Sequence, residues 1–207
     1  MNADTQLFFI TGAAGKLECA LDLPKADPEG IVLIAHPHPL YGGTMSNKVV
    51  QMIARTFIAL GYIAVRMNFR GVGASEGSHD FGNGETDDMA VLLDHIKKQY
   101  PGLPVVLGGF SFGTYVQSRL QQKLATQGQP PERMVFVSAT AGKWAVDSIP
   151  ADTLLIHGEL DEVVPLPDVF NWARPQDLSV VVVAGADHLF NHKLHHIRHI
   201  ITTVFHH

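Results

Sequence analysis

Ser111 and the glycines on either side of it have the clearest chemical potential in the chain, because they follow an apolar run at Val105–Leu107. The pattern Gly-x-Ser-x-Gly is typical of a nucleophile elbow, a sharp strand-to-helix turn that exposes the serine hydroxyl. A side chain at Gly109 or Gly113 would clash with the neighbouring backbone. The helix expected next directs its free N–H groups toward a developing oxyanion. The pattern predicts a nucleophile at Ser111, although a tight turn without chemistry could share it.

Two further residues could complete this chemistry, and both follow apolar runs. Asp161 comes after the run at 154–156, and His188 comes after the run at 179–183. In an open parallel sheet all carboxyl ends lie at one edge, so these side chains can meet Ser111. His188 would then take the serine proton during attack and return it to the leaving group, while Asp161 orients the imidazole ring.

The elements that must position these residues alternate between apolar runs and helical patterns, which predicts a mainly parallel sheet. An antiparallel hairpin is expected first, over Gln6–Leu23. Short apolar runs predict the remaining strands at Ile31–Ala35, Tyr62–Met67, Val105–Gly109, Met134–Ser138, Thr153–His157 and Ser179–Val183. Helical patterns predict helices at about Ser46–Leu60, Glu85–Tyr100, Phe112–Gln127, Pro167–Ala173 and Phe190–Val204.

Composition indicates a single domain over residues 1–207, since 46% hydrophobic and 17% charged residues can form a sizeable core. The net charge of −5 gives no basic surface for nucleic acid or an anionic membrane, so we expect a small-molecule partner. Cys19 is the single cysteine, which excludes an internal disulfide. With no signal-peptide pattern and no apolar run of about 18 residues, we expect a cytoplasmic protein without a membrane span.

Two further motifs extend the pattern around the elbow: His36–Met45 after the first parallel strand and Asn68–Gly77 after the next. With Ser, Asp and His in that order, the chain resembles small α/β-hydrolase-fold proteins of the dienelactone-hydrolase-like group. The resemblance implies an α/β class, namely an α/β-hydrolase fold with a mainly parallel, doubly wound sheet, an N-terminal antiparallel hairpin and no cap domain. Dienelactone hydrolase itself has a cysteine nucleophile where this chain has Ser111, so its lactone substrate is not carried over.

Several acidic residues compete for the third place in the triad. Glu159, Glu162 and Asp147 are alternatives, but Asp161 stands at the place that the resemblance indicates, in His-Gly-x-x-Asp. We expect the other acids to be solvated or to cap helices.

The oxyanion needs two N–H donors, and the backbone of Phe112, directly after the nucleophile, is expected to be one. By resemblance the second comes from the loop after the first parallel strand. Pro37 and Pro39 have no N–H, which leaves His38 and Leu40. The His-Gly-x form of this loop favours the backbone N–H of His38.

Other candidate residues have plainer interpretations. We expect His157 to pack beneath the Asp161 loop and Arg70 to brace its glycine-rich loop. The loop at 71–77 lacks a third glycine in register, and no Gly-Lys-Ser/Thr follows, so no nucleotide cofactor is expected. A helix near the C-terminus carries four histidines at spacings that could bind zinc, but an ordinary surface helix explains them better, and we predict no metal: His192, His195, His196 and His199.

The sequence therefore predicts a serine hydrolase of small carboxylic esters, lactones or thioesters that acts through an acyl-enzyme without a cofactor. A non-catalytic binding or scaffold protein on the same fold is the alternative. Peptidases and perhydrolases use the same triad and stay open. The interval between Ser138 and Thr153 is too short for a helical cap, so we expect an open site that prefers short acyl chains, with Leu40, Tyr41 and Trp144 as pocket walls.

Overall fold

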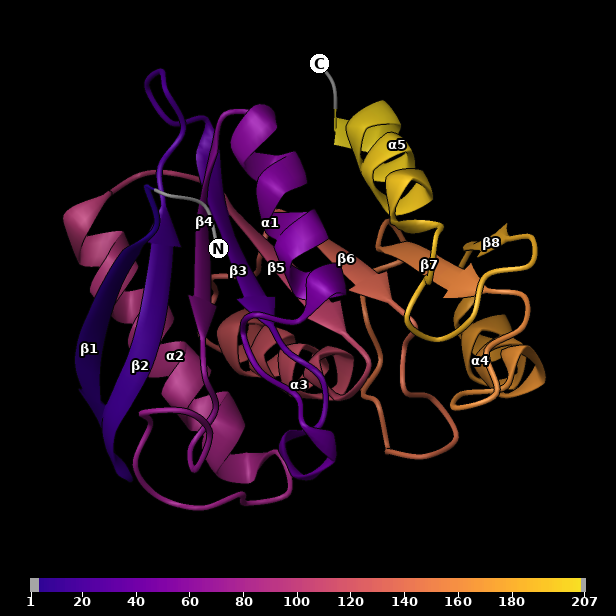
Figure 1. Ribbon diagram of the computed structural model, residues 1–207, viewed down its shortest axis with the longest axis horizontal. Coiled ribbons are helices and arrows are strands. Elements are labelled where there is room, and N and C mark those ends of the chain that lie inside the picture. Colours follow the sequence, from indigo (N-terminus) through magenta and orange to yellow (C-terminus); the bar gives the residue numbers. More distant parts are fainter. Residues whose placement is uncertain (1–3, 206–207) are drawn as a thin grey trace.

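The computed structural model describes residues 4–205 and contains an eight-stranded sheet in the order β1-β2-β4-β3-β5-β6-β7-β8 (Figure 1). β1 pairs with β2 and β2 with β4 in antiparallel fashion, and every other pair is parallel. The strands are β1 Gln6–Gly12, β2 Gly15–Asp22, β3 Gly30–Ala35, β4 Tyr62–Met67, β5 Val105–Phe110, β6 Arg133–Val137, β7 Leu154–Gly158 and β8 Val180–Val183. This is the α/β-hydrolase arrangement that the sequence predicts.

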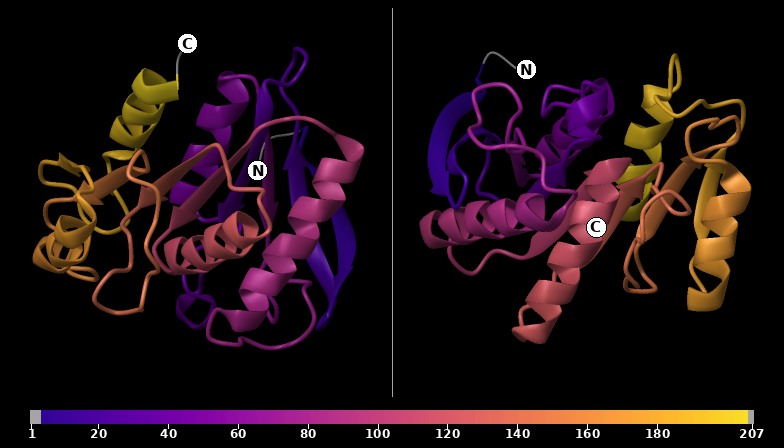
Figure 2. Two further views of the ribbon diagram at one scale, coloured as in Figure 1. Left: turned by 180° about the vertical axis from the view of Figure 1, so that it is seen from behind. Right: turned by 90° about the horizontal axis from the view of Figure 1, so that it is seen from below.

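Helices cover both faces of the sheet, which explains why the central strands are apolar throughout (Figure 2). α1 and α5 pack on one face against alternate strand residues such as Val32 and Ile34. α2 and α3 pack on the other face against Ile31 and Leu33, with Trp172 of α4 on the same core. The helices are α1 Lys48–Ala59, α2 Asn83–Gln99, α3 Phe112–Thr126, α4 Leu166–Ala173 and α5 Leu194–Phe205, with short 3₁₀ turns η1 Pro39–Tyr41 and η2 Arg174–Gln176.

The predicted start of the last helix is wrong by four residues. The sequence favoured a helix from Phe190, but α5 begins at Leu194. Phe190 and His192 have φ values of 51° and 59°, in the left-handed region that interrupts a right-handed helix. The helical spacing of the histidines led to the prediction of an earlier helix start, because sequence periodicity gives no information on the backbone φ of single residues.

The predicted absence of a cap is confirmed. Residues 138–153, all described, form neither helix nor strand apart from an isolated bridge between Ala141 and Trp144. No helix among residues 4–205 is long and apolar enough to cross a bilayer.

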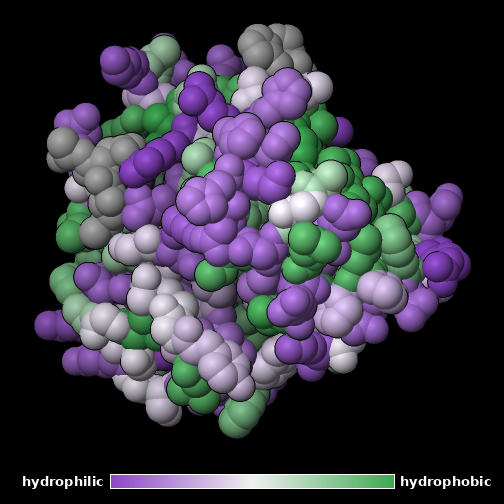
Figure 3. Space-filling view, turned by 45° about the vertical axis from the view of Figure 1, so that its right-hand side comes forward, coloured by the Kyte–Doolittle hydropathy of each residue, from purple (hydrophilic) through white to green (hydrophobic). Residues whose placement is uncertain are grey.

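Both edges of the sheet are partly exposed: Leu7 and Phe9 of β1 are 55% and 54% exposed, and the β8 edge is also open. Val181 and Val182 are each 38% exposed, although the strands at the centre of the sheet are fully buried. Figure 3 brings this side of the molecule forward and shows hydrophobic atoms gathered toward its right, among hydrophilic ones.

Candidate active site

The turn between β5 and α3 has the strained geometry of a nucleophile elbow. Ser111 has φ 53° and ψ −123°, and its residue as a whole is 8% exposed. A Cβ atom at Gly113 would lie 2.2 Å from the carbonyl oxygen of Ala35, and one at Gly109 would lie 2.9 Å from the backbone of Gly113. Both glycines are therefore needed for β3, β5 and α3 to pack closely against one another, as the sequence predicts.

The three predicted site residues meet at the carboxyl edge of the sheet. His188, in the loop after β8, has its Nε2 atom 3.0 Å from Oγ of Ser111. Its Nδ1 atom is 2.8 Å from Oδ2 of Asp161, in the loop after β7. The alternative acid Glu159 is engaged elsewhere, since it accepts a hydrogen bond from the backbone N–H of Gly185 at 2.7 Å. Asp161 is thus the acid that contacts His188.

The surroundings of Asp161 keep its carboxylate charged. Burial alone would raise the pKa of Asp161, but hydrogen bonds from His188 and from the backbone of Val164 outweigh it and lower the pKa. Oδ1 accepts the N–H groups of Val163 and Val164 at 3.0 and 2.8 Å. A charged Asp161 accepts from Nδ1 of His188, which leaves Nε2 with its lone pair toward Ser111.

His157 packs beneath this loop, as predicted. Its side chain is 1% exposed, and Nε2 donates to the carbonyl oxygen of Val164 at 2.9 Å. Burial lowers the pKa of His157, so the ring stays neutral. It supports the Asp161 loop from below and does not reach Ser111 in any contact of the described residues.

The loop after β3 lies against the elbow. Its hydrogen bonds distinguish the two candidates for the second oxyanion N–H donor, His38 and Leu40. The ring of His38 is 4.7 Å from that of Phe112. The N–H of Leu40 donates to Nδ1 of His38 at 3.2 Å, within η1. Because this N–H is occupied, Leu40 is the weaker candidate for the second oxyanion donor.

The three suggested pocket residues differ in placement. Trp144 is half-buried, with its ring 4.8 Å from that of Phe112 and 5.5 Å from that of His38. Tyr41 is 88% exposed and contacts the ring of His38, with centroids 4.9 Å apart. Leu40 is 70% exposed. Trp144 and Tyr41 therefore lie beside the loop next to the elbow, while contact of any of the three with a substrate remains a prediction.

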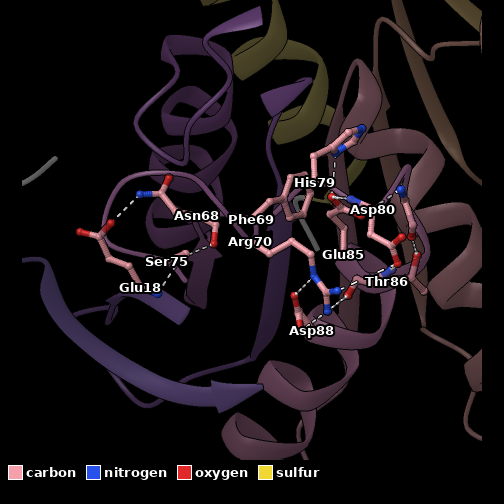
Figure 4. A network of polar contacts seen from close by, with 12 residues as sticks. Glu18, Asn68, Phe69, Arg70, Ser75, His79, Asp80, Glu85, Thr86 and Asp88 are labelled. Carbon is pink, nitrogen blue, oxygen red and sulfur yellow. Dashed lines mark hydrogen bonds and ion pairs between the residues drawn. The ribbon is translucent and has the colours of Figure 1, made fainter. Parts of the chain in front are cut away.

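Arg70 belongs to a polar network that ties the glycine-rich loop to α2 (Figure 4). Its Nε and Nη2 atoms contact the two carboxylate oxygens of Asp88 at 2.7 and 2.9 Å, and Nη2 also donates to the carbonyl of Gly84. The hydrogen bonds that Arg70 donates to Asp88 raise the pKa of Arg70, so the guanidinium stays charged, whereas burial raises the pKa of Asp88. The expected bracing role of Arg70 is confirmed.

Sequence reasoning missed two histidines that join the loops around the site. Nε2 of His36 accepts the N–H of Phe69 at 2.9 Å, and Nδ1 donates to the carbonyl of Pro37. His79 pairs with Glu85 on α2 at 2.8 Å, and its ring lies 4.8 Å from that of His38. Both roles depend on contacts between separate loops, and spacing along the chain gives no signal for them.

Among residues 4–205, no group of three or more His, Cys, Asp or Glu side chains is arranged to hold a metal ion. The rings of His195 and His196 lie 4.1 Å apart on α5.

Comparison with known protein families assigns the chain to one of them. Residues 26–150 match the family model Hydrolase_4, described as serine aminopeptidase, S33. The chain belongs to this family of α/β-hydrolase-fold serine hydrolases.

Full-length relatives agree with this assignment. XC6422 of Xanthomonas campestris, an α/β serine hydrolase described as lacking a lid, is 34% identical over 99% of this chain and 94% of its own, with a TM-score of 0.90. An α/β serine hydrolase homologue of Coxiella burnetii is 32% identical, covering 98% and 97% of the two chains, with a TM-score of 0.88. The uncharacterized protein RP471 of Rickettsia prowazekii is 30% identical over 91% of this chain and 83% of its own.

A more distant relative is the lysophosphatidylserine lipase ABHD12 of Danio rerio, 32% identical over 50% of this chain. The matched part spans 28% of that protein.

Proposed function

We propose that the protein is a serine hydrolase of small carboxylic esters, lactones or thioesters, acting through an acyl-enzyme on Ser111. The observation that carries this proposal is the continuous contact from Oγ of Ser111 to His188 at 3.0 Å and on to Asp161 at 2.8 Å. A scaffold protein would have no need for all three side chains in this arrangement.

The reaction begins with attack of Ser111 Oγ on the substrate carbonyl carbon as its proton passes to Nε2 of His188. Asp161 stabilises the imidazolium that forms. The tetrahedral intermediate collapses when His188 gives the proton to the leaving alcohol, and water then attacks the acyl-enzyme by the same proton transfers in reverse. The nucleophile, base and acid all come from the chain, so the scheme needs no cofactor.

The developing oxyanion would be stabilised by the backbone N–H groups of Phe112 and His38. Phe112 is the first residue of α3, where N–H groups lack partners within the helix and the helix dipole is positive. His38 is preferred because the N–H of Leu40 already donates within its own loop. Removing one such donor typically costs about 10²–10³-fold in kcat.

The names of the relatives indicate two kinds of substrate. The family name refers to an aminopeptidase and ABHD12 to a lipase of a lysophospholipid, an ester. We favour ester cleavage, since an alkoxide leaving group needs less assistance from the proton of His188 than an amine does.

The test compares hydrolysis of p-nitrophenyl acetate by the wild type and by Ser111→Ala, with an aminoacyl p-nitroanilide as the peptidase substrate and EDTA in parallel reactions. We expect Ser111→Ala to lose at least about 10⁴-fold in kcat while its circular dichroism stays unchanged, because one oxygen atom leaves a turn that its glycines still permit. EDTA should have no effect. Comparable activity in the variant would contradict the proposal. Faster cleavage of the anilide than of the ester would show that the protein is a peptidase and not an esterase.

A further inference from the structure

A second histidine–carboxylate pair lies beside the candidate active site. Nδ1 of His79 is 2.8 Å from Oε1 of Glu85, and the two side chains are 6% and 0% exposed. Glu85 also accepts the backbone N–H groups of Asp80 and Gly82, both at 2.9 Å (Figure 4). A carboxylate that accepts three hydrogen bonds fixes the imidazole proton on Nδ1 of His79.

This tautomer leaves a lone pair on Nε2 of His79, and that atom is unpartnered. It is buried and has no hydrogen-bond partner among residues 4–205. A buried polar atom without a partner costs about 1–3 kcal/mol, which a phenylalanine at this position would avoid. A histidine here is therefore better explained by a partner that binds to Nε2 than by packing alone.

The position of the ring indicates what that partner is. His79 lies 4.8 Å from the ring of His38 and 5.5 Å from that of Phe112, the two residues whose backbone N–H groups we assign to the oxyanion. The ring of His79 therefore packs against both of these residues, beside the loop and the elbow that flank Ser111. The ring of Phe81 also packs on His79 at 5.0 Å, and Phe81 is 64% exposed. We infer that rotation of this exposed side chain gives a substrate access to Nε2.

We propose that His79, held by Glu85, determines specificity by accepting a hydrogen bond from a hydroxyl group of the substrate. The inference rests on the proposed esterase function and adds the substrate class, hydroxylated small esters. The lone pair on Nε2 requires a hydrogen-bond donor, and a hydroxyl group supplies one. An anionic substituent is disfavoured because the buried carboxylate of Glu85 contacts the same imidazole ring, whereas the carboxylate of Asp80 is offset by Arg70, 4.0 Å away.

Matched ester pairs test this assignment. Ethyl 3-hydroxybutyrate is compared with ethyl butyrate, and 2-hydroxyethyl butyrate with propyl butyrate, so that the hydroxyl is placed on the acyl or on the alcohol side. Monoethyl succinate is included as an ester with an anionic substituent. One hydrogen bond to a buried acceptor predicts about a tenfold preference in kcat/KM for the hydroxylated member of at least one pair. His79→Phe should bring that ratio close to one, whereas His199→Phe on the exposed side of α5 should keep it.

The outcomes are separable from the failure of the esterase proposal. If no ester in the panel is hydrolysed, the proposed function fails and this inference falls with it. If esters are hydrolysed without any hydroxyl preference, if the preference survives in His79→Phe, or if monoethyl succinate is the favoured member, only the role of His79 is overturned.

A readout that needs no turnover is the imidazole ¹⁵N spectrum of Ser111→Ala. We expect His79 to be the Nδ1–H tautomer, with its Nε2 signal moving on addition of the preferred hydroxy ester and not of its deoxy partner. A proton found on Nε2 at neutral pH would contradict the acceptor role.

Discussion

Two histidine–carboxylate pairs lie at the carboxyl edge of this sheet, and they differ in what their outer nitrogen contacts. In both, Nδ1 is 2.8 Å from a buried carboxylate oxygen, of Asp161 for His188 and of Glu85 for His79. Nε2 of His188 then contacts Oγ of Ser111, whereas Nε2 of His79 has no partner among the described residues. In our proposals, the same kind of pair prepares a base in one place and a hydrogen-bond acceptor in the other. The group that Nε2 contacts therefore determines the role of each histidine.

The largest expected difference between the pairs comes from removing the acid behind His188. Asp161→Asn should lower kcat for p-nitrophenyl acetate by about 10⁴-fold, because an amide donor to Nδ1 turns the ring to the wrong tautomer. The matched control is Asp187→Asn, next to His188 in sequence, whose carboxylate accepts hydrogen bonds from Asn191 instead. We expect it to lose less than about tenfold. Equal losses in the two variants would show that the contact between Asp161 and His188 does not matter for catalysis.

His36 is a third buried histidine, and it differs from the other two because both of its ring nitrogens form hydrogen bonds with backbone groups. Nε2 must stay an acceptor for Phe69, and burial lowers the pKa of His36 to about 3. In the unfolded chain it titrates near the ordinary value of about 6.5, so below that pH the unfolded state binds more protons. Its contribution to stability is therefore complete above about pH 6.5 and is lost toward pH 3, by up to about 1.4 kcal/mol per pH unit.

Urea unfolding of the wild type and of His36→Gln between about pH 5 and 7 checks this, since carboxylates contribute little in that range. Glutamine can still accept from Phe69 but does not titrate. The free energy of unfolding of the variant should depend less steeply on pH. Parallel curves would mean that His36 takes up its proton over the same pH range in the folded and unfolded states, which would contradict the lowered pKa.

The smallest expected effect concerns the apolar part of the substrate. Since residues 138–153 form no cap, added methylenes stay in water and do not contribute the ~0.8 kcal/mol that each gains when buried. We expect kcat/KM for p-nitrophenyl esters to peak at about two to six acyl carbons and to vary only several-fold within that range. A clear preference for twelve carbons or more, below micelle-forming concentrations, would reveal an apolar groove and remove the argument for compact substrates.

Much of the fold and of the triad is predictable because these features depend on local patterns. Apolar runs fix the strands, the steric requirements at Gly109 and Gly113 mark the elbow, and the shared edge of a parallel sheet brings Asp161 and His188 to Ser111. The start of α5 could not be predicted, since it depends on the backbone handedness at Phe190 and His192.

The second histidine pair illustrates what sequence patterns do not contain. His79 and Glu85 are six residues apart, in a loop and on α2, with no recognisable motif. The role we propose for them depends on the rings of His38, in the loop after β3, and of Phe112, at the start of α3. Such contacts between loops exist only after the sheet has brought the loops together.

We propose that Ser111 is an activated nucleophile, and covalent labelling tests this property without depending on the choice of substrate. The wild type, Ser111→Ala and Asp161→Asn are incubated with a fluorophosphonate, and the adduct is located by mass spectrometry of the intact protein and its peptides. We expect one stoichiometric adduct on Ser111 of the wild type, none in Ser111→Ala and much slower labelling in Asp161→Asn. A wild type that stays unlabelled, or an adduct on another residue, would contradict the proposal.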